Sequence, residues 1–313
     1  MLTSAQISTG TLGLLAALLA AVVWSMSTVL YKKAGRVVPP VELNLVKGVV
    51  AGLLLGLLLA VTGDGSAWQA AWPMSLLLVS GVIGLGIGDT AFFAALNRLG
   101  ARRVLLLELT VPPMTAIGAW LALGEVVDGW GWIGIAITTL GIAWVVAERR
   151  AEHDPHRFTT VGLSLAMLAT ACQAGGAIIA RGVFLNTEVS SAGSALVRIL
   201  GGTLVLLVIL PIARRRHALG EPRHGGIDWP NLNKVALPLG GAILLGTFFG
   251  VWLQQTAFKL APSVGSAQGM IATTPLWVLP LAAMSGEKVT RRSVYGACVA
   301  LVGVLILLGL IRF

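Results

Sequence analysis

The chain has 313 residues, of which 56% are hydrophobic and only 11% are charged, and its formal net charge is +9. Because a soluble domain carries roughly 25% charged residues to solvate its surface, this composition excludes an ordinary water-soluble protein. The basic residues lie in short segments between apolar runs rather than on one continuous face, so the positive charge does not indicate a nucleic-acid partner.

Ten apolar runs are close in length to the ~20 residues that cross a bilayer, and they predict an all-α integral membrane protein. In chain order, the predicted spans are 10–31, 40–62, 73–96, 103–123, 127–147, 159–181, 190–212, 234–257, 264–284 and 291–311. No Lys or Arg precedes the first run, whereas Lys32 and Lys33 follow it, which reverses the charge order of a cleavable signal peptide. We therefore predict that the first run is a transmembrane helix.

The chain contains an internal repeat that is clearest from the third predicted span onward. Eight residues recur at one constant offset: Gly84, Gly88, Ala95, Pro113, Gly124, Glu125, Gly134 and Gly141 return as Gly246, Gly250, Ala257, Pro275, Gly286, Glu287, Gly296 and Gly303. A weaker match pairs Lys47 with Arg198. The repeat predicts two five-helix halves, 1–150 and 159–313, joined by a cytoplasmic linker at 151–158. Because five is odd, the repeats should be inverted, a construction that is common in secondary transporters.

The distribution of Lys and Arg predicts the orientation in the membrane. The segments after the odd-numbered spans hold most of these residues, whereas the opposite side holds only Arg181, Lys259 and Arg312. Since cytoplasmic loops are enriched in Lys and Arg, both termini and the loops with Asp64 and Asp128 are expected outside. We expect a multi-pass protein of the inner (plasma) membrane.

The repeated motif has a Pro in the fourth span of each half, followed by Gly-Glu and two later glycines. The copies are Pro112-Pro113, Gly124-Glu125, Gly134 and Gly141, and Thr274-Pro275, Gly286-Glu287, Gly296 and Gly303. This motif resembles the fourth and fifth helices of EamA-type members of the drug/metabolite transporter superfamily. Trp24-Ser25 resembles the Trp-Gly of that family, Lys47 falls where many members have Arg, and Arg198 keeps the Arg. The resemblance implies a carrier of small solutes, such as amino acids, nucleotide sugars, vitamins or drugs, and leaves the cargo open.

Four ionisable residues within the predicted spans are the strongest candidates for a functional site: Lys47, Asp89, Glu108 and Arg198. Charged groups in a bilayer cost roughly 2.5 to 3.5 kcal/mol each, so these are expected to face a cavity or a partner. Lys47 and Asp89 either contact an anionic group of the substrate or only neutralise each other. Arg198 either serves the second access state or snorkels to the headgroups. Glu108 is a candidate proton-coupling group, with pairing to the basic loop at 102–103 as the alternative.

Polar and aromatic side chains in the spans complete the predicted substrate site: Trp24, Gln173, Gln254 and Gln268. Such side chains also join membrane helices without any ligand, so that interpretation stays open. Four prolines are predicted to break helices: Pro112, Pro113, Pro275 and Pro280. Broken helices at matched places in two halves point to a binding site, and purely structural kinks are the alternative.

The sequence lacks the motifs of several function classes. It has no HExxH, GxSxG or Walker motif, and Cys172 and Cys298 stand alone within apolar runs, so we expect neither an enzyme nor a metal or other cofactor. We predict a gradient-coupled secondary transporter of a small metabolite, with an amino-acid-like or other anionic or zwitterionic solute favoured. A flippase for lipids or lipid-linked sugars and a channel-like subunit are the alternatives, and a homodimer stays open.

Overall fold

The computed structural model describes residues 8–34, 38, 40–68, 70–99, 101–148, 159–218, 229–277, 280, 291–308 and 310–311, and the regular elements of this part are helical. Within it, six helices are long and apolar enough to cross a membrane, and three shorter apolar helices accompany them: Val111–Leu123, Gly129–Trp144 and Val294–Leu307. The prediction of an all-α multi-pass membrane protein is therefore confirmed. The number of ten spans stays a prediction, in part because 281–284, the end of the ninth predicted span, lies outside the described residues.

The first half of the chain is a series of helical elements. These are α1 (Thr9–Ala34), α2 (Pro40–Thr62), η1 (Ser66–Trp68), α3 (Ala71–Gly81), η2 (Val82–Gly88), α4 (Asp89–Leu99), α5 (Ala101–Glu108), α6 (Val111–Leu123) and α7 (Gly129–Glu148), in which α3, η2 and α4 form one continuous run. The elements of the second half are α8 (Thr160–Asn186), α9 (Ser191–Ala218), α10 (Trp229–Ala242), η3 (Ile243–Phe249), α11 (Gly250–Leu260), α12 (Val264–Ile271) and α14 (Arg291–Leu307). The linker predicted at 151–158 lies outside the described residues.

A π-helical segment of seven residues interrupts one long helix in each half. η2 continues α3 and leads into α4, and η3 lies in the same way between α10 and α11. A π-helical turn holds one residue more than an α-helical turn, is rare, and occurs frequently at functional sites. Because η2 contains Gly84 and η3 contains its repeat mate Gly246, the same local distortion occurs at matched places in both halves.

The last helices of the two halves, α7 and α14, pack along the repeated glycines. A Cβ atom added at Gly134 would lie 3.1 Å from the carbonyl oxygen of Gly303, and one added at Gly141 would lie 2.8 Å from that of Gly296. Each glycine therefore faces the repeat mate of the other, as expected for helices related by a two-fold axis. Small residues at such a seam let helix backbones approach closely.

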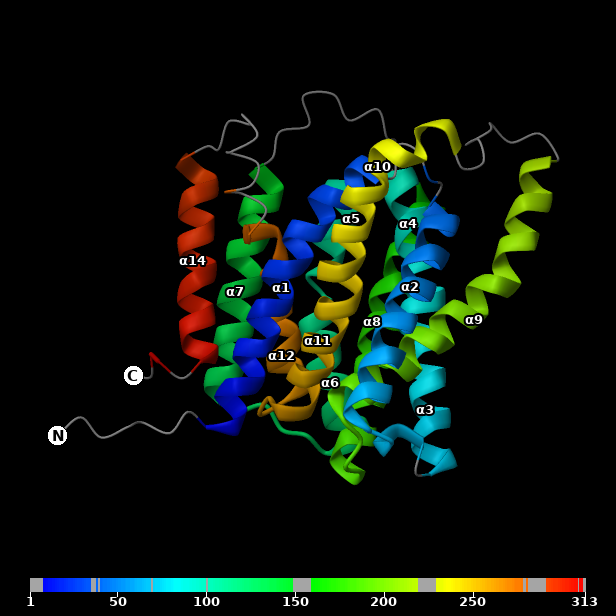
Figure 1. The fold of residues 1–313 in the computed structure, drawn as a ribbon. Coiled ribbons are helices and arrows are strands. Elements are labelled where there is room, and N and C mark those ends of the chain that lie inside the picture. Colours follow the sequence, from blue (N-terminus) through cyan, green and yellow to red (C-terminus); the bar gives the residue numbers. More distant parts are fainter. Residues whose placement is uncertain are drawn as a thin grey trace.

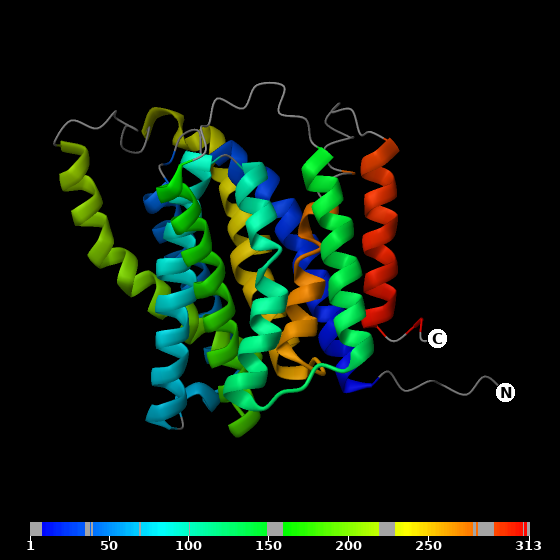
Figure 2. The same cartoon turned by 180° about the vertical axis from the view of Figure 1, so that it is seen from behind.

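The two halves run in opposite directions through the bundle (Figures 1 and 2). α1 begins at the end of the bundle where α14 stops, whereas α8 begins at the opposite end, where α7 stops. α1 packs against α10, η3 and α11, and α8 packs correspondingly against α3, η2 and α4. Each half therefore covers the π-helical segment of the other half.

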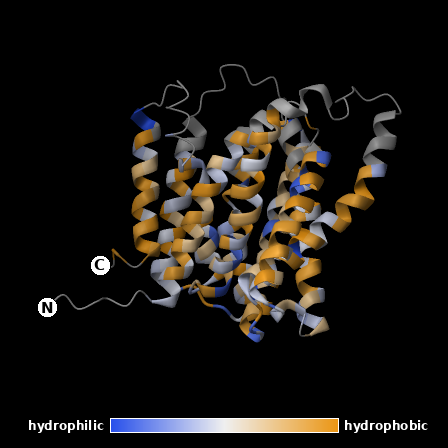
Figure 3. Ribbon diagram, viewed as in Figure 1, coloured by the Kyte–Doolittle hydropathy of each residue, from blue (hydrophilic) through white to orange (hydrophobic). Residues whose placement is uncertain are grey.

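Large apolar side chains cover the outer faces of the helices. Leu53 on α2, Leu121 on α6 and Val208 on α9 are exposed by 69%, 72% and 62%. Figure 3 shows hydrophobic residues along most of the described helices. Such surface would be unfavourable in water over this extent, so it is the surface that contacts lipid.

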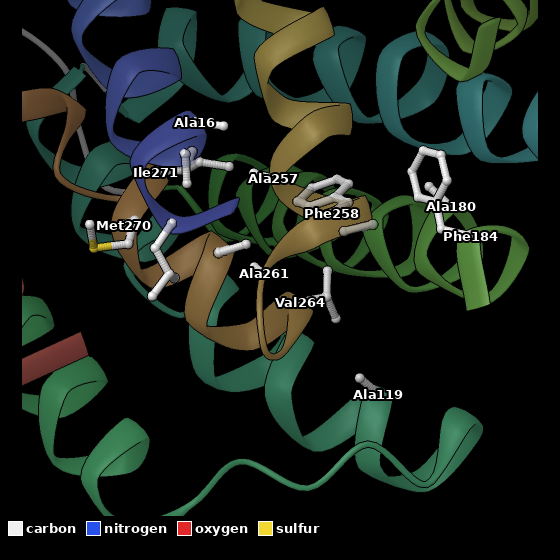
Figure 4. Packing of buried hydrophobic residues seen from close by; sticks show 14 of the residues in the cluster. Ala16, Ala119, Ala180, Phe184, Ala257, Phe258, Ala261, Val264, Met270 and Ile271 are labelled. Carbon is white, nitrogen blue, oxygen red and sulfur yellow. The ribbon is translucent and has the colours of Figure 1, made fainter. Parts of the chain in front are cut away.

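A core of small and aromatic side chains lies toward the end of the bundle where α11 joins α12 (Figure 4). It includes Ala119 of α6, Ala180 of α8, Phe258 of α11 and Val264 of α12, all of which are buried. The alanines bring the helices close together, and Phe258 fills the space between them. The two halves are therefore tightly packed at this end.

Candidate functional site

An ion pair between Lys47 and Asp89 lies at the contact of the two halves. Lys47 extends from α2 and Asp89 begins α4 directly after η2, and their Nζ and Oδ2 atoms are 3.2 Å apart. The two side chains are 20% and 16% exposed. Gln173 of α8 donates from Nε2 to Asp89 Oδ1 at 3.4 Å, which adds a long hydrogen bond from the second half. The structure thus brings three of the predicted site residues together.

Tyr31 and Thr247 complete this polar cluster and were not predicted. The Tyr31 hydroxyl on α1 and the Thr247 hydroxyl in η3 are hydrogen-bonded at 2.9 Å, and Tyr31 lies within electrostatic reach of Lys47 and Asp89. Tyr31 stands directly before two lysines, a position typical of an aromatic residue at the membrane interface, and for this reason the sequence does not indicate that it joins the polar cluster. For Thr247, the one signal was its place beside the repeated Gly246.

Arg198 lies in the protein interior on α9, and its side chain is 1% exposed. The alternative that it snorkels to the headgroups is therefore wrong. Its guanidinium carbon lies 6.0 Å from the Phe258 ring centroid, and Gly84 and Gly176 leave room beside Nη2, where an added Cβ would come within 3.2 and 3.4 Å. Within the described part of the chain, its Nε and Nη1 atoms have no hydrogen-bond partner. A buried guanidinium that keeps unpaired donors is costly, so an acceptor is expected to reach it in some state of the protein.

A second side chain with an unpaired donor belongs to α11, which packs against α9. Ser194, one turn before Arg198, donates its hydroxyl to Gln255 Oε1 at 2.9 Å. Gln255 is fully buried, and its Nε2 atom has no partner among the described residues. The α9–α11 contact therefore contains unused donors from two side chains. Gln254 and Gln255 are neighbours of the same residue type in one predicted span, and both could supply hydrogen bonds in a cavity; the structure buries both, 5% and 0% exposed.

Glu108 ends α5 and is half-buried. Its carboxyl group lies within electrostatic reach of Asp89, so the predicted proton-coupling residue is close to the ion pair. The side chains of 102–103, its alternative partners, lie outside the described residues. Its counterpart in the second half is Met270, which is buried in the apolar core, so this carboxyl group is a feature of the first half alone.

Trp24 connects α1 to the π-helical segment of the other half. Its indole N–H donates to the carbonyl oxygen of Gly246 at 2.7 Å. Gln254 and Gln268 are buried on α11 and α12, 5% and 4% exposed, and neither is bonded to Asp89 in the described structure. These two predicted substrate-binding residues are therefore not joined to the ion pair by a hydrogen bond.

The prolines lie next to matched breaks in the two halves. α5 ends at Glu108 and α6 begins at Val111, so Pro112 and Pro113 fall in the first turn of α6, where a missing N–H is tolerated. In the second half, the chain leaves the α12 helix after Ile271, before Pro275. The backbone N–H of Thr110 donates to the Leu107 carbonyl oxygen at 3.0 Å, and that of Thr273 donates to the Met270 carbonyl oxygen at 3.1 Å. Both breaks therefore contain the same tight turn. Pro280 is exposed, and its neighbours on both sides lie outside the described residues.

Comparisons with known proteins agree with the two-half construction. Residues 11–147 and 160–309 each match the EamA-like transporter family. A crystal structure that carries only the description "Crystal structure of protein" has a TM-score of 0.72 and 18% sequence identity, over 96% of this chain and 98% of that chain, which shows a common fold. The comparison with curated proteins gives no match. Because the family match covers both halves, the chain belongs to the EamA-like transporter family of the drug/metabolite transporter superfamily, whose members are transporters rather than enzymes.

Proposed function

We propose that the protein is a secondary transporter that moves a small metabolite across the plasma membrane by alternating access. The proposal takes 1–150 and 159–313 as inverted five-helix halves with ten spans in total, joined at 151–158. It is supported by the glycine seam of α7 and α14 and by the opposite directions of α1 and α8. Inverted halves allow two nearly equivalent packings, one open to each side of the membrane.

The proposed solute site lies between the halves, around Lys47, Asp89, Gln173 and Arg198, and takes an anionic or zwitterionic solute such as an amino acid. The observation that carries this proposal is the buried Arg198 side chain with two donors that no described residue satisfies. An anionic solute can accept charge-assisted hydrogen bonds from these guanidinium donors, and an apolar solute cannot. Gln255 Nε2 adds a donor in the same helix contact.

Glu108 is the proposed site of proton coupling. Its carboxyl group lies within electrostatic reach of Asp89, and a carboxyl group can bind and release a proton. A proton that is bound in one access state and released in the other would link solute movement to a proton gradient.

The experiment is untargeted metabolomics of cells and medium for four strains: one without the protein, one with the wild type, and two with variants. Arg198→Gln removes the buried cation. Arg98→Ala is the matched control, since Arg98 is exposed at the end of α4 and, among the described residues, donates a hydrogen bond only to the carbonyl oxygen of Ala94, one turn earlier. Equal amounts of each protein in the membrane fraction establish that the comparison concerns function.

A metabolite that the wild type and Arg98→Ala shift, and Arg198→Gln does not, identifies the cargo and supports the site. An equal shift by Arg198→Gln would contradict the proposed role of Arg198. If no metabolite differs between the empty strain and the wild type under any growth condition, the transport proposal itself is contradicted.

A further inference from the structure

A buried ion pair joins the two halves at the end of the bundle where α11 meets α12. Nε and Nη2 of Arg181, on α8, each lie 2.7 Å from Oε1 of Glu125. The two side chains are only 8% and 9% exposed. Glu125 follows Gly124, which ends α6 with φ of +67°, a left-handed conformation that glycine adopts without strain. The first copy of the Gly-Glu motif therefore turns the chain so that the carboxylate reaches the other half; the second copy, at 286–287, lies outside the described residues.

The same pair is bonded to both sides of the α11–α12 connection. Arg181 Nη1 donates to the carbonyl oxygens of Phe258 and Lys259, at 2.6 and 3.0 Å, in the last turn of α11. Oε2 of Glu125 accepts from the backbone N–H of Val264, the first residue of α12, at 2.9 Å. A cation at a helix C-terminus and an anion at a helix N-terminus are both favourable, and these bonds satisfy backbone groups that helix ends leave free.

Apolar packing closes the space beside this ion pair. A Cβ atom added at Gly265 of α12 would lie only 2.6 Å from the Ala116 Cβ of α6, so these two helices are in close contact. Ala119 and Val264 are 1% and 0% exposed in the adjoining core. In this structure, no room for water separates α6 from α12 at these residues.

We propose that the Glu125–Arg181 pair is the contact that holds this end of the solute pathway closed and must separate once in every transport cycle. The proposal rests on the alternating-access function proposed above. A contact between halves at a closed end must break when that end opens. A buried ion pair suits this role, because its attraction and its desolvation cost nearly offset each other, and water solvates both charges once they separate. A substitution that removes one partner has a different effect. It leaves the other charge buried without a partner in the closed state, and so it favours the open state, in which water solvates that charge.

The test measures how fast a buried thiol reporter at this end reacts with a sulfonated, water-soluble maleimide. The purified full chain in lipid nanodiscs carries Cys172→Ser and Cys298→Ser, so that Ala119→Cys supplies the reporter thiol. Glu125→Gln in this background is expected to raise the labelling rate about tenfold, which corresponds to about 1.4 kcal/mol in favour of the open state. A unimodal gel-filtration peak at the position of the parent establishes that the variant is folded.

Lys259→Gln is the matched control. It removes a charge at the same end, but the Lys259 ammonium donates to the Val189 carbonyl oxygen at 2.9 Å, and both residues belong to the second half. We expect its labelling rate to equal that of the parent. Arg181→Lys is the second variant and keeps the charge while losing the forked geometry, so it should also label faster.

An unchanged labelling rate in both Glu125→Gln and Arg181→Lys would overturn the proposal, as would an equal increase in Lys259→Gln. If Glu125→Gln does not give a folded protein, Arg181→Lys alone decides between these outcomes. Labelling requires no solute, so a failure here differs from a failure of the proposed function, which shows as an absence of any metabolite shift.

Discussion

Replacement of Lys47 by Met and of Asp89 by Asn, singly and together, separates a structural from a functional role for this ion pair. Lys47→Met leaves the Asp89 carboxylate with the long 3.4 Å hydrogen bond from Gln173. Removal of one partner from a fully buried pair costs roughly 3 to 5 kcal/mol. Because these side chains are 20% and 16% exposed, we expect about 2 kcal/mol for either single variant. The double variant removes both charges and should recover most of this loss.

The assay is the midpoint of thermal unfolding in detergent, followed by gel filtration with fluorescence detection. At about 2 °C or slightly more per kcal/mol for a large chain, each single variant should unfold roughly 5 °C below the wild type. The double variant should unfold within about 2 °C of the wild type. If the pair also contacts solute, the double variant stays inactive although its stability is restored. Additive losses in the double variant, or unchanged midpoints in both single variants, would refute the reasoning.

Two further predictions concern the α7–α14 seam and the loop after α2. Gly303→Val should separate α14 from α7, since an added Cβ would lie 2.9 Å from the Gly134 carbonyl oxygen, and should lower stability by roughly 1 to 3 kcal/mol in the same thermal assay. Hydrogen bonds, of which that from Ser190 has the largest effect, hold the pKa of Asp64 below its usual value. Ionised Asp64 therefore stabilises the fold at neutral pH, and this stabilisation is lost as the pH falls through the lowered pKa. The difference in midpoint between the wild type and Asp64→Asn should therefore be present at pH 7 and shrink below about pH 4, and a difference independent of pH would contradict this cause.

Much of the fold follows from the apolar runs and the repeated glycines, whereas details set by tertiary packing do not. The recurrence of Gly134 and Gly141 predicts a duplication, but only the structure shows that each lies against the mate of the other. The π-helical segments were not predicted, because one extra residue in a turn barely changes the periodicity of an apolar span. Arg198 illustrates the same limit, since the sequence does not distinguish a side chain that snorkels from one enclosed by Gly84 and Gly176.

The two Arg198 donors that no described residue satisfies have an explanation in the repeat itself. At the offset that relates Gly84 to Gly246, the counterpart of Asp89 is Val251, which is buried and apolar. Lys47 is therefore bonded to a carboxylate of its own half, whereas its repeat mate Arg198 has no carboxylate at the equivalent place and lies only within electrostatic reach of the same Asp89. The backbone repeats can still interconvert as near mirror states, while the charges are unequal. The Arg198 guanidinium therefore keeps two hydrogen-bond donors, Nε and Nη1, that no described residue satisfies and that an anionic solute can use.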